Sequence, residues 1–267
     1  MQDKYVGDIG DFGKYALLSF IQKKTDLSLG IIWYLVNPDH TDREHQANDG
    51  KHISYLGING KPDKKLQDME PVLFDRLRSI VEEKRRKVQF IMDDKILGLN
   101  ATFFDALVSI SPANKGVRND WVKHAIKAVE GKEVIFLDPD NGLANGETCS
   151  GCKLDAKYVF RSELDEFWGD GRRVVVLYHH PNRSEKNVDH DMQIDNLVKS
   201  LEERPALKKA KVLPLRYRRG TSRVYFVIVP RNKAAHWKNW LYEFAEKWPA
   251  RKIKGKLIRA FECKFPP

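Results

Sequence analysis

The residues with the clearest chemical potential lie in one short segment near the middle of the chain. Asp138, Asp140 and Asn141 follow an apolar run, Val134 to Leu137, and Gly142 ends the segment. The run is typical of a buried strand in a parallel sheet, and the polar cluster with Pro139 is typical of a tight turn. Because open α/β sheets bind ligands at the carboxyl ends of their strands, we predict a catalytic site containing the three polar side chains. The alternative is a strand followed by a simple turn.

Elements that would position these side chains alternate along the sequence. We expect helices over residues 11–24, 71–84, 121–129, 162–168, 192–201 and 237–248, and strands over 29–36, 88–92, 134–137, 173–178, 212–217 and 224–229. Strands that alternate with helices predict a mainly parallel sheet with helices on both faces, and the last two strands predict an antiparallel hairpin. The fold class is therefore α/β and Rossmann-like, in a single domain over 1–267, with residues 37–70 forming a loop or a small insertion.

The overall composition is that of a globular protein with a basic surface. The chain has 267 residues, of which 42% are hydrophobic and 31% charged, and its formal net charge is +10. No apolar stretch is long enough to span a membrane, and the first residues lack a secretory signal core, so we expect a cytoplasmic location. The positive charge favours nucleic acid as a partner, the alternative being an ordinary basic protein.

Three stretches, in the same order along the chain, carry a resemblance to a known family. They are Gly7-Asp8-Ile9-Gly10-Asp11-Phe12-Gly13-Lys14-Tyr15, Leu137-Asp138-Pro139-Asp140, and residues 219–230, RGTSRVYFVIVP. With them the chain resembles the Rossmann-like S-adenosylmethionine-dependent methyltransferases. Within that superfamily it distantly resembles the bacterial large-subunit ribosomal RNA adenine-N6 methyltransferases of the RlmJ type. The third stretch resembles the closing hairpin strand of that family.

The resemblance implies a reaction and a set of site residues. Asp138 would accept a hydrogen bond from the acceptor amine and orient it toward the methyl group of S-adenosylmethionine. The N-terminal segment helps to bind the cofactor in that family, which makes Asp11, Lys14 and Tyr15 candidate contacts. Further candidate cofactor contacts follow the first two expected strands: Asn37 after the first, and Asp93 and Asp94, which would meet a ribose hydroxyl, after the second.

Two departures from the family pattern concern the same site. Asp140 and Asn141 stand where the family has a proline and an aromatic residue that stacks on the flipped base. After the first strand the family has a glycine-rich turn, whereas this chain continues with Asn37 and Pro38 and has no glycine before Gly50. The cofactor pocket is therefore expected to be altered or lost. For Asp11, capping of the first helix is an alternative to a cofactor contact.

A second constellation suggests different chemistry. His179 and His180 end one expected strand, and Asp189, His190 and Asp191 follow within the same thirteen residues. Together with Asp138 and Asp140 they could bind a divalent metal, as in a nuclease or phosphodiesterase. The alternative is a set of exposed histidines near a helix start. The cysteines do not form a zinc motif, because Cys149 and Cys152 make one C-x-x-C pair and Cys263 is remote.

The turn of the C-terminal hairpin is rich in arginine. Arg216, Arg218, Arg219 and Arg223 lie there with Tyr217 and Tyr225. Guanidinium groups beside aromatic rings suit phosphate contact and base stacking, so we predict that these arginines bind nucleic acid. A solvated hairpin tip is the alternative. A third hypothesis for the whole protein is a non-catalytic nucleic-acid-binding module that has lost the cofactor site.

Overall fold

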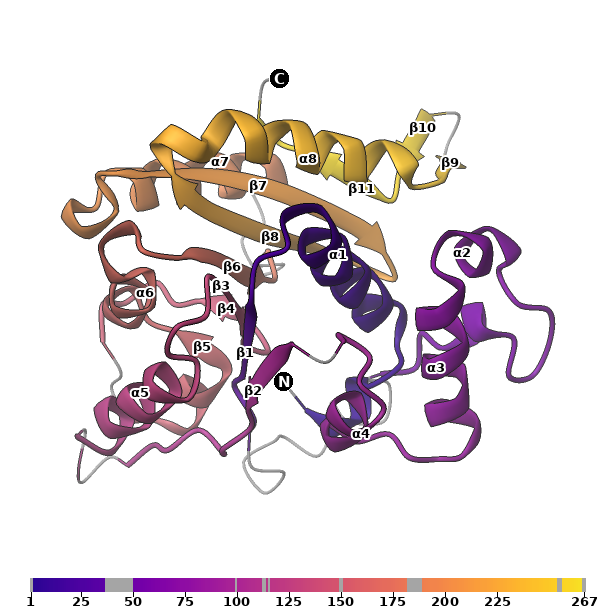
Figure 1. Ribbon diagram of the computed structural model, residues 1–267, viewed down its shortest axis with the longest axis horizontal. Helices are drawn as coiled ribbons and strands as arrows, with labels where there is room; N and C mark the ends of the chain where they lie inside the picture. Colours follow the sequence, from indigo (N-terminus) through magenta and orange to yellow (C-terminus); the bar gives the residue numbers. More distant parts are fainter. Residues whose placement is uncertain are drawn as a thin grey trace.

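A seven-stranded mixed sheet forms the centre of the molecule (Figure 1). The computed structural model describes residues 2–36, 50–98, 100–111, 114, 116–148, 151–181, 189–253 and 256–265. The sheet order is β11-β7-β8-β6-β3-β1-β2. Its strands are β1 (Leu29–Trp33), β2 (Ala101–Phe104), β3 (Val134–Asp138), β6 (Val174–His179), β7 (Ala210–Arg219), β8 (Thr221–Pro230) and β11 (Phe261–Cys263). Strands β2, β1, β3 and β6 are parallel, whereas β8 is antiparallel to both β6 and β7, and β11 is antiparallel to β7.

Helices cover both faces of this sheet. Beside one face lie α1 (Ile9–Thr25), α2 (Lys64–Met69), α3 (Pro71–Glu82), α4 (Val88–Asp93) and α8 (Ala234–Lys247); beside the other lie α5 (Gly116–Ala128), α6 (Arg161–Trp168) and α7 (His190–Glu202). Strand residues alternate between the two cores: Ile31 and Phe136 belong to the first, and Ile32 and Leu137 to the second. The predicted α/β class, with helices on both faces and a closing antiparallel hairpin, is confirmed.

Two short ladders lie outside the main sheet. β4 (Gly142–Leu143) pairs with β5 (Tyr158–Val159), and β9 (Ala250–Ile253) pairs with β10 (Lys256–Arg259). The first of them immediately follows the polar turn after β3, so it fixes where that turn ends.

Strand order reverses between β1 and β3. The chain runs from β1 to the edge strand β2 on one side, returns to β3 on the other side, and then continues to β6. Connections that leave in opposite directions open a crevice at the carboxyl ends of the two adjacent strands, and this is where doubly wound sheets bind their ligands. Trp33 and Asp138 are paired at those ends.

One predicted strand is a helix. Residues 88–92 form most of α4, and the strand beside β1 is β2, Ala101–Phe104. Within α4, Val88 and Ile91 are buried, which is the three-residue spacing of a helix face, whereas a strand would bury alternate residues. Asp93 and Asp94 therefore do not lie at the end of a strand, which contradicts the reason for predicting them as ribose contacts.

The first helix begins earlier than predicted. α1 starts at Ile9, and the carboxylate of Asp8 caps it by accepting hydrogen bonds from the backbone N–H groups of Gly10 and Asp11. The capping role considered for Asp11 thus belongs to Asp8. Other predicted helices and strands differ only at their ends, such as the first strand, which stops at Trp33.

The region predicted as a loop or small insertion contains some regular structure. Residues 50–70 include a short 3₁₀ turn, η4 (Ser54–Leu56), and helix α2, while Asn37 lies outside the described residues. Among the described helices, none is long and apolar enough to cross a membrane.

Candidate functional site

The candidate site lies where β3 ends at the strand-order reversal. Asp138 is the last residue of β3, is 1% exposed, and lies on the α1 face of the sheet, like Phe136 two residues before it. The strand alternation of β3 decides this direction, because residues two apart point to the same face. The carboxylate therefore faces the first helix rather than solvent.

Lys14 joins the first helix to the end of β3. Its ammonium nitrogen lies 2.7 Å from a carboxylate oxygen of Asp138 and 2.8 Å from one of Asp11. The Lys14 side chain is buried, and its two partners come from elements that are far apart in the sequence. Two of the stretches that suggested a methyltransferase thus meet at one buried ammonium group.

The third stretch reaches the same place through Arg223. Its guanidinium lies 3.7 Å from the Asp8 carboxylate and donates hydrogen bonds to the Tyr178 hydroxyl and the Arg219 carbonyl. Burial raises the pKa of Tyr178 to about 12, so its hydroxyl is protonated at pH 7. That hydroxyl is also hydrogen-bonded to the ring of His180, at 2.8 Å. A continuous polar network therefore runs from the cap of α1 to the half-buried His180.

We call the buried group of Asp8, Asp11, Lys14, Asp138 and Arg223 the acidic cluster. It holds three carboxylates and two cations, so one negative charge is in excess among these five when all are ionised; the half-buried Arg86 guanidinium also interacts with Asp8 and Asp11. Burial raises the pKa of Asp11 to about 6, against the opposing charge of Lys14 and with help from Asp8 and Asp138. An uncompensated buried charge is unfavourable by itself, so the cluster favours either a proton on Asp11 or a cationic group beside it.

Three buried polar groups around the cluster have no hydrogen-bond partner among the described residues. They are the hydroxyls of Tyr15 and Tyr225 and the indole nitrogen of Trp33. The Tyr15 ring lies 5.4 Å from the Lys14 nitrogen, and Tyr225 packs on Tyr178. An unpartnered buried hydroxyl costs about 1–3 kcal/mol. Unpartnered buried atoms also occur away from the cluster, such as Trp168 Nε1 and Arg173 Nη1, so these three groups do not by themselves identify a ligand site.

The turn after Asp138 is held by its neighbours. The Gln2 amide donates a hydrogen bond to the Asp140 carboxylate, Asn141 donates its N–H to the Lys157 carbonyl, and His180 donates its N–H to the Asn141 carbonyl. Asp140 and Asn141 are partly exposed. Gly142 has a φ of 113°, and a Cβ there would lie 2.3 Å from the His179 ring, so only glycine fits. The predicted catalytic loop is thus a defined structure beside the cluster.

The histidines do not gather around Asp138. His179 lies on the opposite face of the sheet from Asp138, where its Nδ1 accepts a hydrogen bond from the Leu143 N–H. Burial lowers the pKa of His179 to about 4, so it is neutral at pH 7. Asp191 forms ion pairs with Arg216 and Lys264. Over the described parts of the chain, no group of three or more His, Cys, Asp or Glu side chains is arranged to hold a metal ion.

An acidic residue missed by sequence reasoning follows the true second strand. Asp105 comes directly after β2 and is exposed, in the position that had been assigned to Asp93 and Asp94. Those two instead hydrogen-bond within and beside α4, Asp93 to Gln89 and Asp94 to Arg85. The signal for Asp105 was present in the sequence, since Ala101 to Phe104 is a β-branched and aromatic run that ends in an aspartate.

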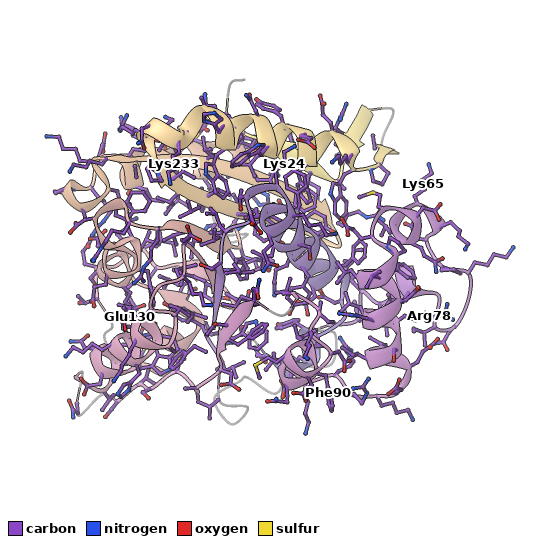
Figure 2. The ribbon with its side chains drawn as sticks, in the orientation of Figure 1. Lys24, Lys65, Arg78, Phe90, Glu130 and Lys233 are labelled. Atoms are coloured by element: carbon purple, nitrogen blue, oxygen red, sulfur yellow. The ribbon has the colours of Figure 1, made fainter. Side chains whose placement is uncertain are left out.

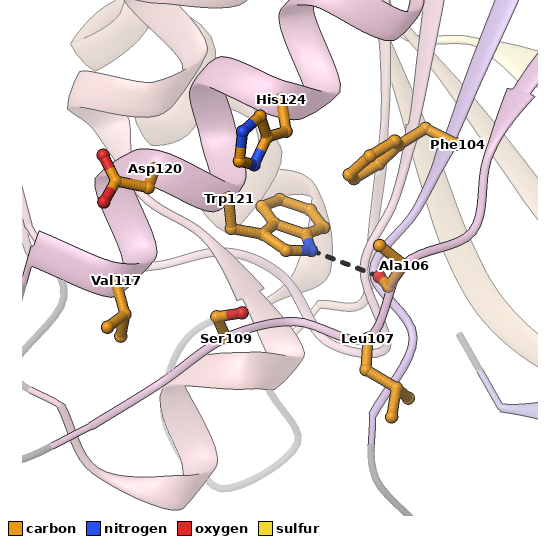
Figure 3. Close-up of a pocket in the computed structure, with 8 residues that line it drawn as sticks. All are labelled: Phe104, Ala106, Leu107, Ser109, Val117, Asp120, Trp121 and His124. Carbon is orange, nitrogen blue, oxygen red and sulfur yellow. Dashed lines mark hydrogen bonds between the residues drawn. The ribbon is translucent and has the colours of Figure 1, made fainter.

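An open cleft adjoins the end of β2 and is shown in Figure 3. Its volume is about 450 Å³, and it is lined by Phe104, Ala106, Leu107, Ser109, Val117, Asp120, Trp121 and His124. The Trp121 indole donates a hydrogen bond to the Ala106 carbonyl, at 3.1 Å, which fixes the loop after β2 against α5. Phe104 and Trp121 give the cleft an aromatic lining, and Ser109, Asp120 and His124 are its polar lining residues. Such a surface suits a flat ring with polar substituents.

The hairpin arginines are not an open basic patch. Arg219 and Arg223 are 6% and 5% exposed, and Arg219 forms an ion pair with Asp63. Arg216 and Arg218 share the other face of β7 and form ion pairs with Asp191 and Glu262. Arg219 and Arg223 thus point inward, and both guanidinium groups are enclosed by the protein. For all four arginines the contact with nucleic-acid phosphates stays a prediction.

A second buried ion pair lies on the opposite face of the sheet, between α5 and α6. Arg118 donates to both carboxylate oxygens of Glu163, at 2.6 and 2.9 Å, and its guanidinium lies 5.1–5.7 Å from the rings of Tyr34, Trp121 and Phe160. Here one cation meets one carboxylate, so the charges balance.

Among the described cysteines, Cys152 and Cys263 are free thiols; Cys149 lies outside the described residues. The Cys152 sulfur lies 3.1 Å from an oxygen of Asp155.

These observations define the chain as a Rossmann-like α/β protein with a buried acidic cluster at the reversal of strand order. No protein-family model matches the sequence, and no curated protein matches it.

Proposed function

We propose that the protein is a methyltransferase that uses S-adenosylmethionine and modifies nucleic acid, with Asp138 positioning the acceptor amine. The main support for this proposal is that residues from three separate stretches of the chain lie together. Lys14 and Asp8 from the N-terminal stretch, Asp138 from the central one and Arg223 from the hairpin stretch form a single buried cluster. They meet at the reversal of strand order, where this class of sheet binds ligands.

The residues suit catalysis by positioning and electrostatics. An amine conjugated to a base ring is a poor nucleophile, because its lone pair is delocalised. A carboxylate such as Asp138 accepts a hydrogen bond from that amine and favours the geometry of attack. The nitrogen lone pair then forms the new N–C bond, the electrons of the broken C–S bond stay on sulfur, and the amine proton leaves through Asp138. Bound S-adenosylmethionine supplies the activated methyl group.

The residues present fit the charge of that cofactor. The acidic cluster has an excess negative charge, and the sulfonium and ammonium groups of S-adenosylmethionine are cationic. The unpartnered hydroxyls of Tyr15 and Tyr225 offer hydrogen bonds beside it. The cleft at the end of β2 suits the adenine ring, and Asp105 would meet the ribose hydroxyls. The cleft lies on the α5 face of the sheet and Asp138 on the α1 face, so the bound cofactor would have to pass over the strand ends between β2 and β3.

Nucleic acid is the acceptor that the charge supports best. The net charge of +10 attracts a polyanion. Figure 2 labels Lys24, Lys65, Arg78 and Lys233, and they come from four different helical elements. We therefore expect binding with strong salt dependence and little dependence on any single lysine.

Calorimetry with S-adenosylmethionine tests the proposal, followed by transfer of a labelled methyl group to mixed RNA and DNA. We expect binding, and transfer that is lost in Asp138→Asn. The matched control is Asp68→Asn, which makes the same change at an exposed position of α2. No binding at millimolar cofactor, in folded protein with nucleic acid present, would refute the methyltransferase proposal. Salt-dependent RNA binding without cofactor binding would then identify a non-catalytic module.

The metal-dependent nuclease remains the alternative at the same site. Nucleic acid incubated with Mg²⁺ or Mn²⁺ should stay intact in the presence of the wild-type protein. Cleavage that is lost in Asp138→Ala would favour this alternative over methyl transfer.

A further inference from the structure

We propose that Lys14 is a positioning residue, which holds the Asp138 carboxylate in its orientation, and that it is not a contact of the cofactor. The inference rests on the proposed function. It assigns to Lys14 a role different from the cofactor contact that the N-terminal stretch suggested.

The first argument is geometric. One Lys14 nitrogen lies 2.7 Å from Asp138 and 2.8 Å from Asp11, and these carboxylates come from β3 and α1. A charge-assisted hydrogen bond of this length fixes the orientation of a carboxylate. The register of β3 brings Asp138 to the α1 face, and the i,i+3 spacing of Lys14 and Asp11 places the ammonium beneath it. The Lys14 nitrogen thus links α1 to the end of β3.

The second argument is electrostatic. Asp11 and Asp138 are 2% and 1% exposed, so solvent cannot separate their charges. Two buried carboxylates that share one site do not both stay ionised without a cation between them. Burial opposes the charge of Lys14, but Asp11 and Asp138 raise its pKa well above the usual value, so the ammonium persists over the whole working pH range. Removal of that ammonium would take away the charge that lowers the pKa of Asp11, so Asp11 would keep its proton to higher pH.

The third argument concerns access. Lys14 is 3% exposed, and the rings of Tyr15 and Tyr178 lie 5.4 and 5.6 Å from its nitrogen. The ammonium is already surrounded by two carboxylates and two rings. Burial alone does not distinguish Lys14 from Asp138, which is 1% exposed, but these occupied surroundings do. Tyr178 is held by Arg223, and Arg223 lies beside Asp8. Tyr178 and Arg223 thus hold the surroundings of Lys14 in place. Fixed surroundings suit a group that orients another residue.

Asp11 acts as the second holder of Lys14. Its other oxygen accepts a hydrogen bond from the Gly7 N–H, at 3.3 Å, just before α1 begins. This contact ties the carboxylate to the N-terminal turn and limits the positions that the Lys14 side chain can adopt. Asp11 thus completes the cluster without capping the helix.

The experiment separates cofactor binding from chemistry. Wild type, Lys14→Met and Lys14→Arg are compared by calorimetry with S-adenosylmethionine and by single-turnover methyl transfer from pH 5.5 to 9. The control is Lys23→Met on the same helix, where the side chain is 73% exposed. We expect K14M to bind cofactor within about threefold of wild type, to transfer methyl about 100-fold more slowly at pH 7, and to regain rate as the pH rises. K14R should recover part of the rate and restore the wild-type pH dependence.

Two outcomes would overturn the inference. One is a K14M variant that binds S-adenosylmethionine at least tenfold more weakly but transfers methyl normally at saturating cofactor, since that result makes Lys14 a cofactor contact. The other is an unchanged pH profile. If K14M does not fold, K14R is measured alone, because it keeps the charge. Weaker cofactor binding with normal transfer would then overturn the inference, and slower transfer with unchanged binding would support it.

Failure of the proposed function gives a different result. In that case the wild type itself neither binds cofactor nor transfers methyl, and melting temperatures decide the role of Lys14. The melting temperature of K14M should fall relative to that of K23M as the pH rises from 5 to 8, because the two carboxylates then repel. A difference that does not change with pH would refute the role proposed for Lys14 independently of catalysis.

Discussion

Two buried ion-pair networks lie on opposite faces of the sheet, and they differ in charge balance. The Arg118–Glu163 pair has one charge of each sign, and Glu163 also accepts hydrogen bonds from the Phe160 N–H and the Tyr34 hydroxyl. The acidic cluster around Lys14 and Asp138 has an excess carboxylate, and unpartnered hydroxyls lie nearby.

The two networks also differ in where their residues come from. Arg118 and Glu163 link α5 to α6, two neighbouring helices, and their partners are protein groups. The acidic cluster instead collects residues from three distant stretches at the reversal of strand order. Buried charge alone therefore does not indicate a site. We propose that the cluster marks a site because of its charges together with its position at open strand ends.

The largest expected effect is on catalysis by Asp138→Asn. The amide keeps the shape of the side chain, and its oxygen still accepts a hydrogen bond, but the negative charge that takes up the amine proton is lost, so methyl transfer should fall by about 10²–10³-fold. Single-turnover rates at saturating cofactor measure the effect. Glu163→Gln is the partner experiment, and folded E163Q should transfer methyl within a few-fold of wild type. Equal losses in the two variants would break the distinction between the networks.

Arg118→Met should produce the largest loss of stability. The change leaves the Glu163 carboxylate buried at 5% exposure without its cation, which costs about 3–5 kcal/mol. Urea unfolding followed by circular dichroism measures it. Arg78→Met is the control, because the Arg78–Glu82 pair is partly exposed and should contribute about 0.5 kcal/mol. A loss in R118M no larger than in R78M would mean that the buried pair is not structural.

Asp11 makes stability depend on pH. Its pKa is raised by burial from 3.8 to about 6 in the folded protein, so the unfolded chain releases this proton first as the pH rises. Stability contributed by Asp11 is full below pH 4 and is lost between pH 4 and 6, by about 3 kcal/mol. The unfolding free energy of wild type should therefore fall relative to that of Asp11→Asn as the pH rises from 4 to 6. Asp75→Asn, at an exposed position of α3, should show no such change.

The smallest effect is expected at the hairpin surface. Arg218 lies 2.6 Å from Glu262, and the two side chains are 26% and 38% exposed. Solvent screens such a pair, so Arg218→Gln should alter stability by less than about 1 kcal/mol. RNA binding at two salt concentrations shows whether Arg218 also contacts phosphate, since a contact would lower the salt dependence. A stability loss like that of R118M would remove the contrast between buried and exposed pairs.

Local pattern predicted most of the elements, and it misassigned the second strand. The run from Val88 to Met92 is short and mainly apolar, and such a run is compatible with either a strand or a helix turn. That error moved the expected ribose contact from Asp105 to Asp93 and Asp94. Local pattern also could not predict that Arg219 and Arg223 point into the protein, because their partners Asp63 and Asp8 lie far away in the sequence.

The sequence by itself determined the α/β class, the strand that ends at Asp138 and the polar turn after it, because these depend on periodicity and turn chemistry over a few residues. Tertiary structure alone decided the partners of Asp138. The strand alternation turns that carboxylate toward α1, and the sheet order brings Lys14 and Arg223 to the same face. A carboxylate acquires its charge environment from the groups that surround it in space, and those groups lie far from it along the chain.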